Sequence, residues 1–330
     1  MKVQILPNDG IQSLKEWVHQ MAPQFTDFEP MVGDASVRRY VRVKSENQTA
    51  VVMDYPDNEK NTQIFLKIAQ GFLKQGLCVP EIIAYDASRG FVLMSDLGND
   101  LYFNVLSPQT VDALYQNAME ALLLIQACDQ FDDYDLPPFG RDLFFAEMTL
   151  FVEWYLGRHL NYVPTAKEKS LLDRVFRSLA EDALKQTQLC VHRDYHCKNL
   201  LKLEGKKVGI LDFQDAVKGP ITYDLMSLLR DCYIDWSDQQ LQQWIQYYYD
   251  QACEAKLIKN ISLPQFIQWF DWMTLQRNLK CIGLFPRLNY RDQKPQYMQY
   301  LPRVFNYALR VCQRYPHFSE FGKFLKRVNM

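Results

Sequence analysis

The chain has 330 residues and a formal net charge of -2, and 48% of its residues are hydrophobic and 14% aromatic. This length and composition predict a folded protein with room for two lobes that each have a core, and they exclude a disordered chain. The near-neutral charge balance gives no electrostatic reason to expect binding to nucleic acid or to an anionic membrane.

The opening segment MKVQILPNDGIQSLKEWVHQ has neither the long apolar core nor the small-residue cleavage site of a signal peptide. No stretch reaches the roughly 20 apolar residues that span a bilayer. The eight cysteines are scattered and form no CxxC pair, which favours reduced thiols over a disulfide framework. We therefore expect a cytoplasmic protein without a membrane partner, and a monomer is compatible with the sequence.

Short β-like runs alternate with turns from about Glu29 to Asp96. The runs 37–43 and 49–55 predict two strands, because they are rich in β-branched residues and are bounded by turn signals. Apolar residues at helical spacing predict a helix over 62–76. Two more strands are expected within 79–97, joined by the turn DASRG.

Long amphipathic patterns dominate from Asn99 onward. They predict helices over 107–127, 141–160 and 165–184, and helices again over most of the region after Ser237. A small β island at 189–215 interrupts them. We expect an α+β fold with a small, β-rich N-terminal lobe at 1–96 and a larger helical C-terminal lobe at 97–330.

The β island holds the densest polar stretch of the chain, VHRDYHCKNLL. Its pattern predicts a strand, a loop that carries Asp194 and Asn199, and a hairpin whose second strand ends at Asp212. We expect these three side chains to converge at one mouth. Carboxylate and amide oxygens suit Mg²⁺ better than Zn²⁺, and they leave one carboxylate able to accept a proton from a hydroxyl.

Two other interpretations of this stretch stay open. His192 and His196 are four residues apart and are flanked by Cys190 and Cys197, so a zinc site is conceivable, although that spacing aligns ligands on a helix and not on a strand and loop. A solvated charged loop would explain the charges but not the downstream ILDFQD. We expect His192 to be a core histidine that braces the loop.

The arrangement resembles the catalytic loop of protein kinases, H-R-D-x-x-x-x-N followed by D-F-G. The matching residues are HRD at 192–194, Asn199, and Asp212 with Phe213. The resemblance implies that Asp194 is the catalytic base and that Asn199 and Asp212 hold Mg²⁺ on the phosphates of ATP.

Several departures from protein kinases narrow the resemblance. The first lobe has GDASVRRYVRV and no G-x-G-x-x-G loop, and Gln214 replaces the glycine of D-F-G. The continuation AVKGPITYDLMSLLRD resembles the aminoglycoside phosphotransferase and choline kinase superfamily. That resemblance implies a two-lobed, protein-kinase-like fold in which Asp224 anchors the catalytic loop.

Six motifs in the same order, among them VLMSDLG and the long LDFQDAVKGPITYD, are together similar to those of the bacterial N-acetylmuramate/N-acetylglucosamine kinases. This resemblance implies a kinase that phosphorylates the anomeric hydroxyl of a free amino sugar in cell-wall recycling, with ATP and Mg²⁺ as cofactors. The expected partner is therefore a small-molecule amino sugar.

The phosphates of ATP need a cation, yet the run AVVMDYP has no lysine where kinases place one on the third strand. Our hypothesis is that Arg38, Arg39 or Arg42 supplies it, with help from backbone N–H groups of the GDAS turn, which ends at Ser36. On a strand, Arg38 and Arg42 share one face and Arg39 points to the other. A solvated strand face is the alternative for each arginine.

VLMSDLG resembles the linker whose main chain binds adenine in kinases, which implies a role for Met94 and Asp96. In the catalytic loop, His196 or Lys198 is a candidate for contact with phosphate. A sugar pocket combines aromatic rings with hydrogen-bonding groups, and an arginine suits a carboxylate on the acceptor. Candidates for the acceptor site, each with core packing as the alternative, are His196, Asp231, Tyr233, Trp236 and Arg277.

Two rival functions stay open. One is phosphotransfer to an aminoglycoside or to another small hydroxylated metabolite, which an acidic second-lobe cleft would favour. The other is a nucleotide-binding pseudokinase that acts as an interaction module. The missing third-strand lysine favours the pseudokinase, and the intact Asp194, Asn199 and Asp212 favour an enzyme.

Overall fold

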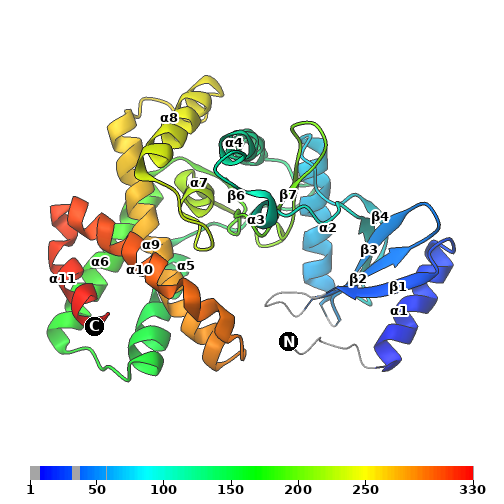
Figure 1. The fold of residues 1–330 in the computed structure, drawn as a ribbon, viewed down its shortest axis with the longest axis horizontal. Helices are drawn as coiled ribbons and strands as arrows, with labels where there is room; N and C mark the ends of the chain where they lie inside the picture. Colours follow the sequence, from blue (N-terminus) through cyan, green and yellow to red (C-terminus); the bar gives the residue numbers. More distant parts are fainter. Residues whose placement is uncertain (1–7, 32–37, 57, 330) are drawn as a thin grey trace. The chain divides into compact units, whose positions relative to one another are not determined.

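The computed structural model describes residues 8–31, 38–56 and 58–329. The chain divides into two compact units (Figure 1). The first unit comprises Met1–Asp100, Gln130–Asp135 and Leu201–Gln214, and the second comprises Leu101–Asp129, Leu136–Leu200 and Asp215–Met330. A sheet dominates the first unit and helices dominate the second, so the expected α+β class is confirmed.

A five-stranded antiparallel sheet with the order β1-β2-β3-β5-β4 forms the centre of the first unit. Its strands are β1 (Asp27–Met31), β2 (Arg39–Lys44), β3 (Thr49–Asp54), β4 (Ile82–Asp86) and β5 (Phe91–Ser95). The four expected strands are β2 to β5. The prediction lacked β1, whose short sequence DFEPM contains a proline, which is tolerated because β1 is an edge strand.

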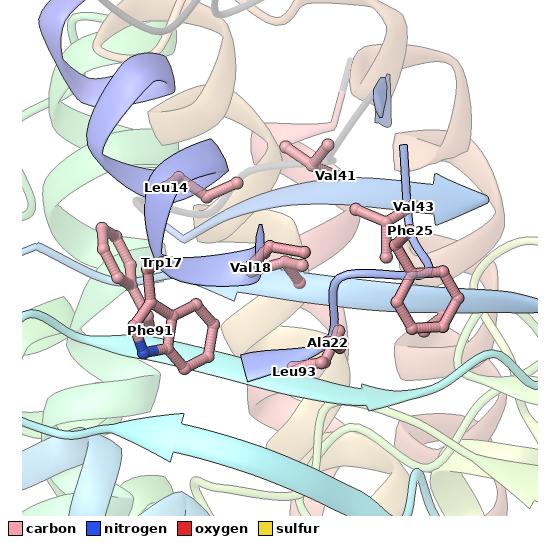
Figure 2. Packing of buried hydrophobic residues seen from close by; sticks show 11 residues of the cluster. Leu14, Trp17, Val18, Ala22, Phe25, Val41, Val43, Phe91 and Leu93 are labelled. Atoms are coloured by element: carbon pink, nitrogen blue, oxygen red, sulfur yellow. The ribbon is translucent and has the colours of Figure 1, made fainter. Parts of the chain in front are cut away.

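Helix α1 (Asn8–Met21) was also missing from the prediction. Leu14, Trp17 and Val18 follow helical spacing and are almost completely buried. They pack in one cluster with Val41 and Val43 of β2 and with side chains of β5 (Figure 2). The odd-numbered residues of β2 therefore face α1, and the even-numbered residues lie on the other face of the sheet.

Helix α2 (Glu59–Lys74) begins earlier than expected and ends as expected beside Gly76, which has a φ of +84°. The hairpin of β7 (Leu200–Lys202) and β8 (Val208–Ile210) joins this unit because Ile210 donates a backbone hydrogen bond to Cys78. Phe213 then stacks on Phe65 of α2 with ring centroids 5.0 Å apart. These contacts group 201–214 with the first unit, although the sequence placed that segment in the second lobe.

The second unit is built around α9 (Leu263–Tyr290), which is buried along most of its length. The helices that pack against it include α5 (Arg141–Leu150), α6 (Ala166–Lys185), α7 (Thr222–Leu229) and α10 (Leu301–Arg314). The remaining helices are α3 (Tyr102–Val105), α4 (Val111–Ala127), α8 (Asp238–Glu254) and α11 (Ser319–Val328), with short 3₁₀ turns at Pro295–Tyr300 and Pro316–Phe318. Strands β6 (Gln188–Val191) and β9 (Val217–Pro220) pair antiparallel.

The helix expected over 141–160 changes type part-way along. It is α-helical to Leu150 and continues as a π-helix over Phe151–His159. A Cβ on Gly283 of α9 would lie 2.1 Å from the carbonyl carbon of Leu150. The two helices thus touch through their backbones where the wider π turns begin, and only glycine fits at that position.

Candidate active site

The loop that follows β6 carries the kinase-like residues, and Asp224 at the first turn of α7 holds its entrance. Asp224 accepts backbone hydrogen bonds from His192 at 2.6 Å and from Arg193 at 2.9 Å. The carboxylate is completely buried, and this burial raises its pKa to about 7 even though the two bonds favour the charged form. The expectation that Asp224 anchors the loop is confirmed.

Arg193 has a φ of +77°, in the left-handed region that non-glycine residues rarely adopt. Two interactions hold it there: its N–H is bound to Asp224, and its guanidinium forms an ion pair with Glu147 of α5 at 3.1 Å. His192 is buried and its Nδ1 accepts the N–H of Asp194 at 3.3 Å, so the predicted bracing role of His192 is confirmed. The strained turn directs the chain into Asp194.

Asp194 and Asn199 lie in the same loop and are joined by a hydrogen bond. The side-chain amide of Asn199 donates to the backbone carbonyl of Asp194 at 2.9 Å, which leaves the Asn199 side-chain oxygen as an acceptor. Burial raises the pKa of Asp194, but electrostatic interactions with Lys280, His196, Arg277 and Arg193 outweigh it and lower that pKa to about 2. Asp194 is therefore ionised at neutral pH and can accept a hydroxyl hydrogen bond.

A buried group of polar side chains surrounds the loop, and Glu147 is at its centre. Lys280 of α9 donates to Glu147 at 2.8 Å, and Gln276 donates to it at 3.1 Å. The hydroxyl of Tyr223 lies 3.2 Å from the same carboxylate and 3.1 Å from Lys280. Burial raises the pKa of Glu147, but Lys280 and Arg193 reverse the direction, so Glu147 stays charged. Neither Glu147 nor Lys280 was predicted as a site residue from the sequence.

Asp231 braces the far end of the loop. Its Oδ2 accepts the backbone N–H of Cys197 at 3.0 Å, and its Oδ1 accepts that of Tyr233 at 2.8 Å. The carboxylate is buried, and both of its oxygens bind the backbone. The structure therefore gives Asp231 a structural task where the sequence suggested contact with the acceptor. Trp236 is similar, because its Nε1 donates to Tyr115 and its ring packs on Trp244.

The other acceptor candidates lie nearer to the catalytic loop. The rings of His196 and Tyr233 meet edge to face with centroids 5.4 Å apart. Arg277 of α9 is buried, and its Nη1 lies 3.8 Å from the Cys281 sulfur. Among the residues that the structure describes, its Nε has no hydrogen-bond partner. A buried guanidinium with an unused donor is suited to an anionic group.

In the first unit, each predicted arginine is paired with a carboxylate. Arg38 binds Asp212 at 2.9 Å, Arg39 binds Asp54 at 2.8 Å and Arg42 binds Asp96 at 2.6 Å. Arg39 lies on the α1 face of the sheet, as the odd residues of β2 do, and Arg42 lies on the opposite face. The predicted division between two faces is therefore confirmed for Arg39 and Arg42, whereas Arg38 precedes β2.

Two of these carboxylates, Asp54 and Asp96, have pKa values shifted in opposite directions. Asp54 is buried, and burial raises its pKa despite Arg39. Burial acts on Asp96 too, but Arg42 and the N–H of Gly98, which donates at 3.0 Å, lower its pKa. Asp96 is thus a fixed anion that orients Arg42. The side chain of Met94 is buried, and its backbone pairs with neighbouring strands.

Asp212 follows β8 and has a φ of +62°. Phe213, buried against α2, fixes this turn. Gln214 donates to Oδ1 of Asp212 at 3.1 Å, and Arg38 uses the same oxygen. The other oxygen of this carboxylate can thus bind a metal ion. Asp194 and Asn199 belong to the second unit, so the expected convergence of the three residues stays a prediction. Ser36 lies outside the described residues.

The types of side chain that the site offers as ligands indicate which metal ion it could hold. Within residues 8–31, 38–56 and 58–329, no three or more His, Cys, Asp and Glu side chains form a group that could hold a metal ion. The zinc alternative therefore has no ligand set in that part of the chain. Mg²⁺ needs only one or two protein oxygens, because phosphates and waters complete its shell, so Asn199 and Asp212 fit that ion by donor chemistry.

In sequence, the chain is similar to a phosphotransferase family and to sugar kinases of one name. Residues 27–257 match the phosphotransferase enzyme family, APH. An N-acetylmuramate/N-acetylglucosamine kinase of Pseudomonas putida is 37% identical over 295 residues, which cover 89% of this chain and 86% of that protein. A kinase of the same name from Neisseria meningitidis serogroup B is 35% identical and covers 92% and 91%.

The fold is also that of solved phosphotransferases. The ADP-bound crystal structure of aminoglycoside phosphotransferase APH(2'')-Ib aligns with a TM-score of 0.61 at 15% identity, over 88% of this chain and 96% of that one. The expected kinase-like fold is therefore confirmed. In the described part of the chain, every helix is too short or too polar to cross a membrane.

Proposed function

Because the chain belongs to the phosphotransferase enzyme family, we propose that it transfers the terminal phosphoryl group of ATP to a hydroxyl of N-acetylmuramate or N-acetylglucosamine. The observation that carries this proposal is the similarity to named kinases for these two sugars over most of both chains. The acceptor atom is the anomeric hydroxyl, and the reaction takes place in the cytoplasm, on a monomer.

Asp194 orients the acceptor hydroxyl and receives its proton. A carboxylate with a pKa of about 2 is a weak base, so proton transfer occurs late, once the bond to phosphorus has made the hydroxyl acidic. Its main contribution is to position the nucleophile in line with the phosphate. The anchored loop supports this role, because Asp224 and Asp231 fix both of its ends.

Mg²⁺ is the second cofactor. Asn199 and Asp212 would hold it, and when bound it neutralises charge on the phosphates of ATP. Phosphate binding also uses arginine, and Arg38 and Arg42 are the preferred candidates. Arg42 lies on the sheet face that α1 does not cover, and Arg38 binds Asp212. Asp96 keeps Arg42 in place, and the main chain of the linker 92–98, which contains Met94 and Asp96, binds adenine.

Arg277 binds the negatively charged side of the acceptor. N-acetylmuramate differs from N-acetylglucosamine by a carboxylate, for which a buried guanidinium is a matching partner. The electrostatic interaction between Arg277 and Asp194 supports a position close to the reacting hydroxyl. His196 and Tyr233 complete the acceptor side, whereas Asp231 and Trp236 serve the fold.

An acceptor panel tests the proposed function. Release of ADP is measured with purified protein, ATP, Mg²⁺ and one of four acceptors: N-acetylmuramate, N-acetylglucosamine, kanamycin or choline. Turnover with the two sugars, and a product whose phosphorus NMR signal couples to the anomeric proton, is the expected result. Turnover with kanamycin or choline alone would assign a different acceptor, and ATP binding without turnover on any acceptor would indicate a pseudokinase.

A further inference from the structure

Lys198 lies between Asp194 and Asn199 in sequence, and four aromatic rings surround its ammonium group. The Nζ atom is 4.1 Å from the ring centroid of Tyr233 and 5.4 Å from that of Phe103. It is 5.4 Å from the centroid of Tyr297 and 5.9 Å from that of Tyr300. All four distances are within the roughly 6 Å over which a ring face attracts a cation.

The four rings come from separate segments of the second unit but form one packed group, the aromatic cage. Phe103 lies in α3, Tyr233 follows α7, and Tyr297 and Tyr300 belong to the 3₁₀ turn before α10. Tyr233 meets Tyr300 edge to face at 4.9 Å and Phe103 at 6.2 Å. Such a cage is the arrangement that proteins use to bind alkylammonium and quaternary ammonium groups.

The cage is also tied to the backbone of the catalytic loop. The N–H of Phe103 donates to the carbonyl of Cys197 at 3.0 Å. Asp231 accepts the N–H groups of both Cys197 and Tyr233, so one carboxylate connects the residue before Lys198 with the nearest ring of the cage. The position of the Lys198 ammonium is therefore coupled to the backbone that carries Asp194 and Asn199.

We propose that the aromatic cage is a cation-binding site that the chain fills with its own Lys198, and that this occupancy makes Lys198 a positioning residue for the loop that carries Asp194 and Asn199. A filled cage also has no room for a quaternary ammonium, which excludes acceptors such as choline from this part of the second unit. The positioning effect rests on the proposed kinase function, whereas the cation site does not.

The first experiment tests the site without using activity. Lys198→Ala empties the cage, and tetramethylammonium is then titrated into the variant and into the native chain, with binding followed by calorimetry. tert-Butanol serves as a neutral probe of similar bulk. We expect tetramethylammonium to bind the variant at least tenfold more tightly than the native chain, and tert-butanol to bind neither. Equal binding to both proteins would overturn the cage as a cation site.

The second experiment tests positioning by chemical rescue. Lys198→Ala should lower kcat about tenfold with a smaller change in the Michaelis constant for ATP, and added ethylammonium or tetramethylammonium should restore part of the lost rate. Lys198→Arg keeps the cation and should retain most activity. Lys206→Ala, at an exposed turn of the β7–β8 hairpin, is the matched control and should behave like the native chain.

The ring variant Phe103→Leu combined with Tyr300→Leu separates the cage from a direct contact between Lys198 and phosphate. If the cage positions the loop, this double variant should reproduce the kcat loss while Lys198 is still present. A raised Michaelis constant for ATP in Lys198→Ala, with no rescue and no effect of the ring variant, would overturn the proposal in favour of phosphate contact. If no acceptor is turned over by the native chain, the proposed function fails, but the calorimetric result still decides the cation site.

Discussion

In the first unit, Arg38, Arg39 and Arg42 each have their own carboxylate, whereas in the second unit a single carboxylate, Glu147, binds both Arg193 and Lys280. The pairs differ in accessibility: the side chain of Asp212 is 39% exposed, whereas those of Asp54 and Asp96 are only 3% and 6% exposed, similar to Glu147 at 5%. A separate, partly exposed pair such as Arg38–Asp212 can exchange its carboxylate for another anion such as phosphate. A shared, buried carboxylate instead fixes the groups that it binds.

The largest effect is expected for Asp194, the carboxylate whose pKa is lowered by Lys280 and by nearby arginines of the second unit. Asp194→Asn should lower kcat at least about a thousandfold, because an amide cannot accept the hydroxyl proton, while the ATP affinity changes little. Steady-state kinetics with the best sugar acceptor and calorimetry with ATP measure the two effects. Asp250→Asn, at an exposed position of α8, is the control. A variant that kept more than a tenth of native turnover would contradict the assigned role.

Removal of Glu147 tests the shared carboxylate. Glu147→Ala should lower the free energy of unfolding by about 3 kcal/mol, because it leaves Arg193 and Lys280 buried without their common anion. Glu147→Gln keeps the shape and should lose less. Denaturant unfolding of the three proteins gives the comparison. A loss below about 1 kcal/mol in the alanine variant would show that Asp194 alone compensates the two cations.

Asp182 of α6 is a buried carboxylate that forms no ion pair within the described residues, so burial dominates its pKa. Its Oδ2 has no hydrogen-bond partner among the described residues, and burial raises its pKa to about 6. Because the folded pKa lies above the unfolded value, the folded state binds more protons between about pH 4 and pH 6, and stability contributed by the neutral acid is lost as the pH rises through that range.

Asp182→Asn should therefore be more stable than the native chain by about 2 kcal/mol at pH 7.5, and the difference should vanish below about pH 4. Thermal or denaturant unfolding at several pH values measures it. An equal difference at pH 4 and pH 7.5 would mean that ionisation of Asp182 is not its cause.

The smallest effects are expected for the paired arginines. Arg39→Ala should cost about 1 kcal/mol of stability, since Asp54, whose pKa burial already raises, can take up a proton when its partner is lost. It should leave the Michaelis constant for ATP unchanged, whereas Arg42→Ala should raise that constant several-fold. If both variants leave ATP binding intact, the proposed phosphate role of Arg42 is wrong.

Much of the fold could be predicted because its signals are local. Alternating and helical apolar patterns gave β2 to β5 and the helices α2, α4 and α6, and the island at 189–215 predicted a strand, a loop and a hairpin in that order. The anchoring role of Asp224 came from a resemblance in the motif that contains it. The helix α1 also has a local signal in Leu14, Trp17 and Val18, and the prediction did not use it.

What could not be predicted depends on residues far apart in the chain. Arg38 and its partner Asp212 are separated by 174 positions, and Glu147 and Lys280 by 133. No pattern in a single sequence specifies which cation meets which carboxylate across such distances. For the same reason, Asp231 and Trp236 looked like acceptor residues, although the fold gives them structural partners.

The contact between Gly283 and the backbone of Leu150 has a consequence for motion. On α5, Leu150 lies three positions after Glu147, and on α9, Gly283 lies three positions after Lys280. The backbone contact and the Glu147–Lys280 ion pair therefore occur within one helical turn of each other. Sliding of one helix along the other would break both at once. Any shear that accompanies a catalytic cycle must therefore take place at other helix interfaces, while α5 and α9 move as a single rigid body.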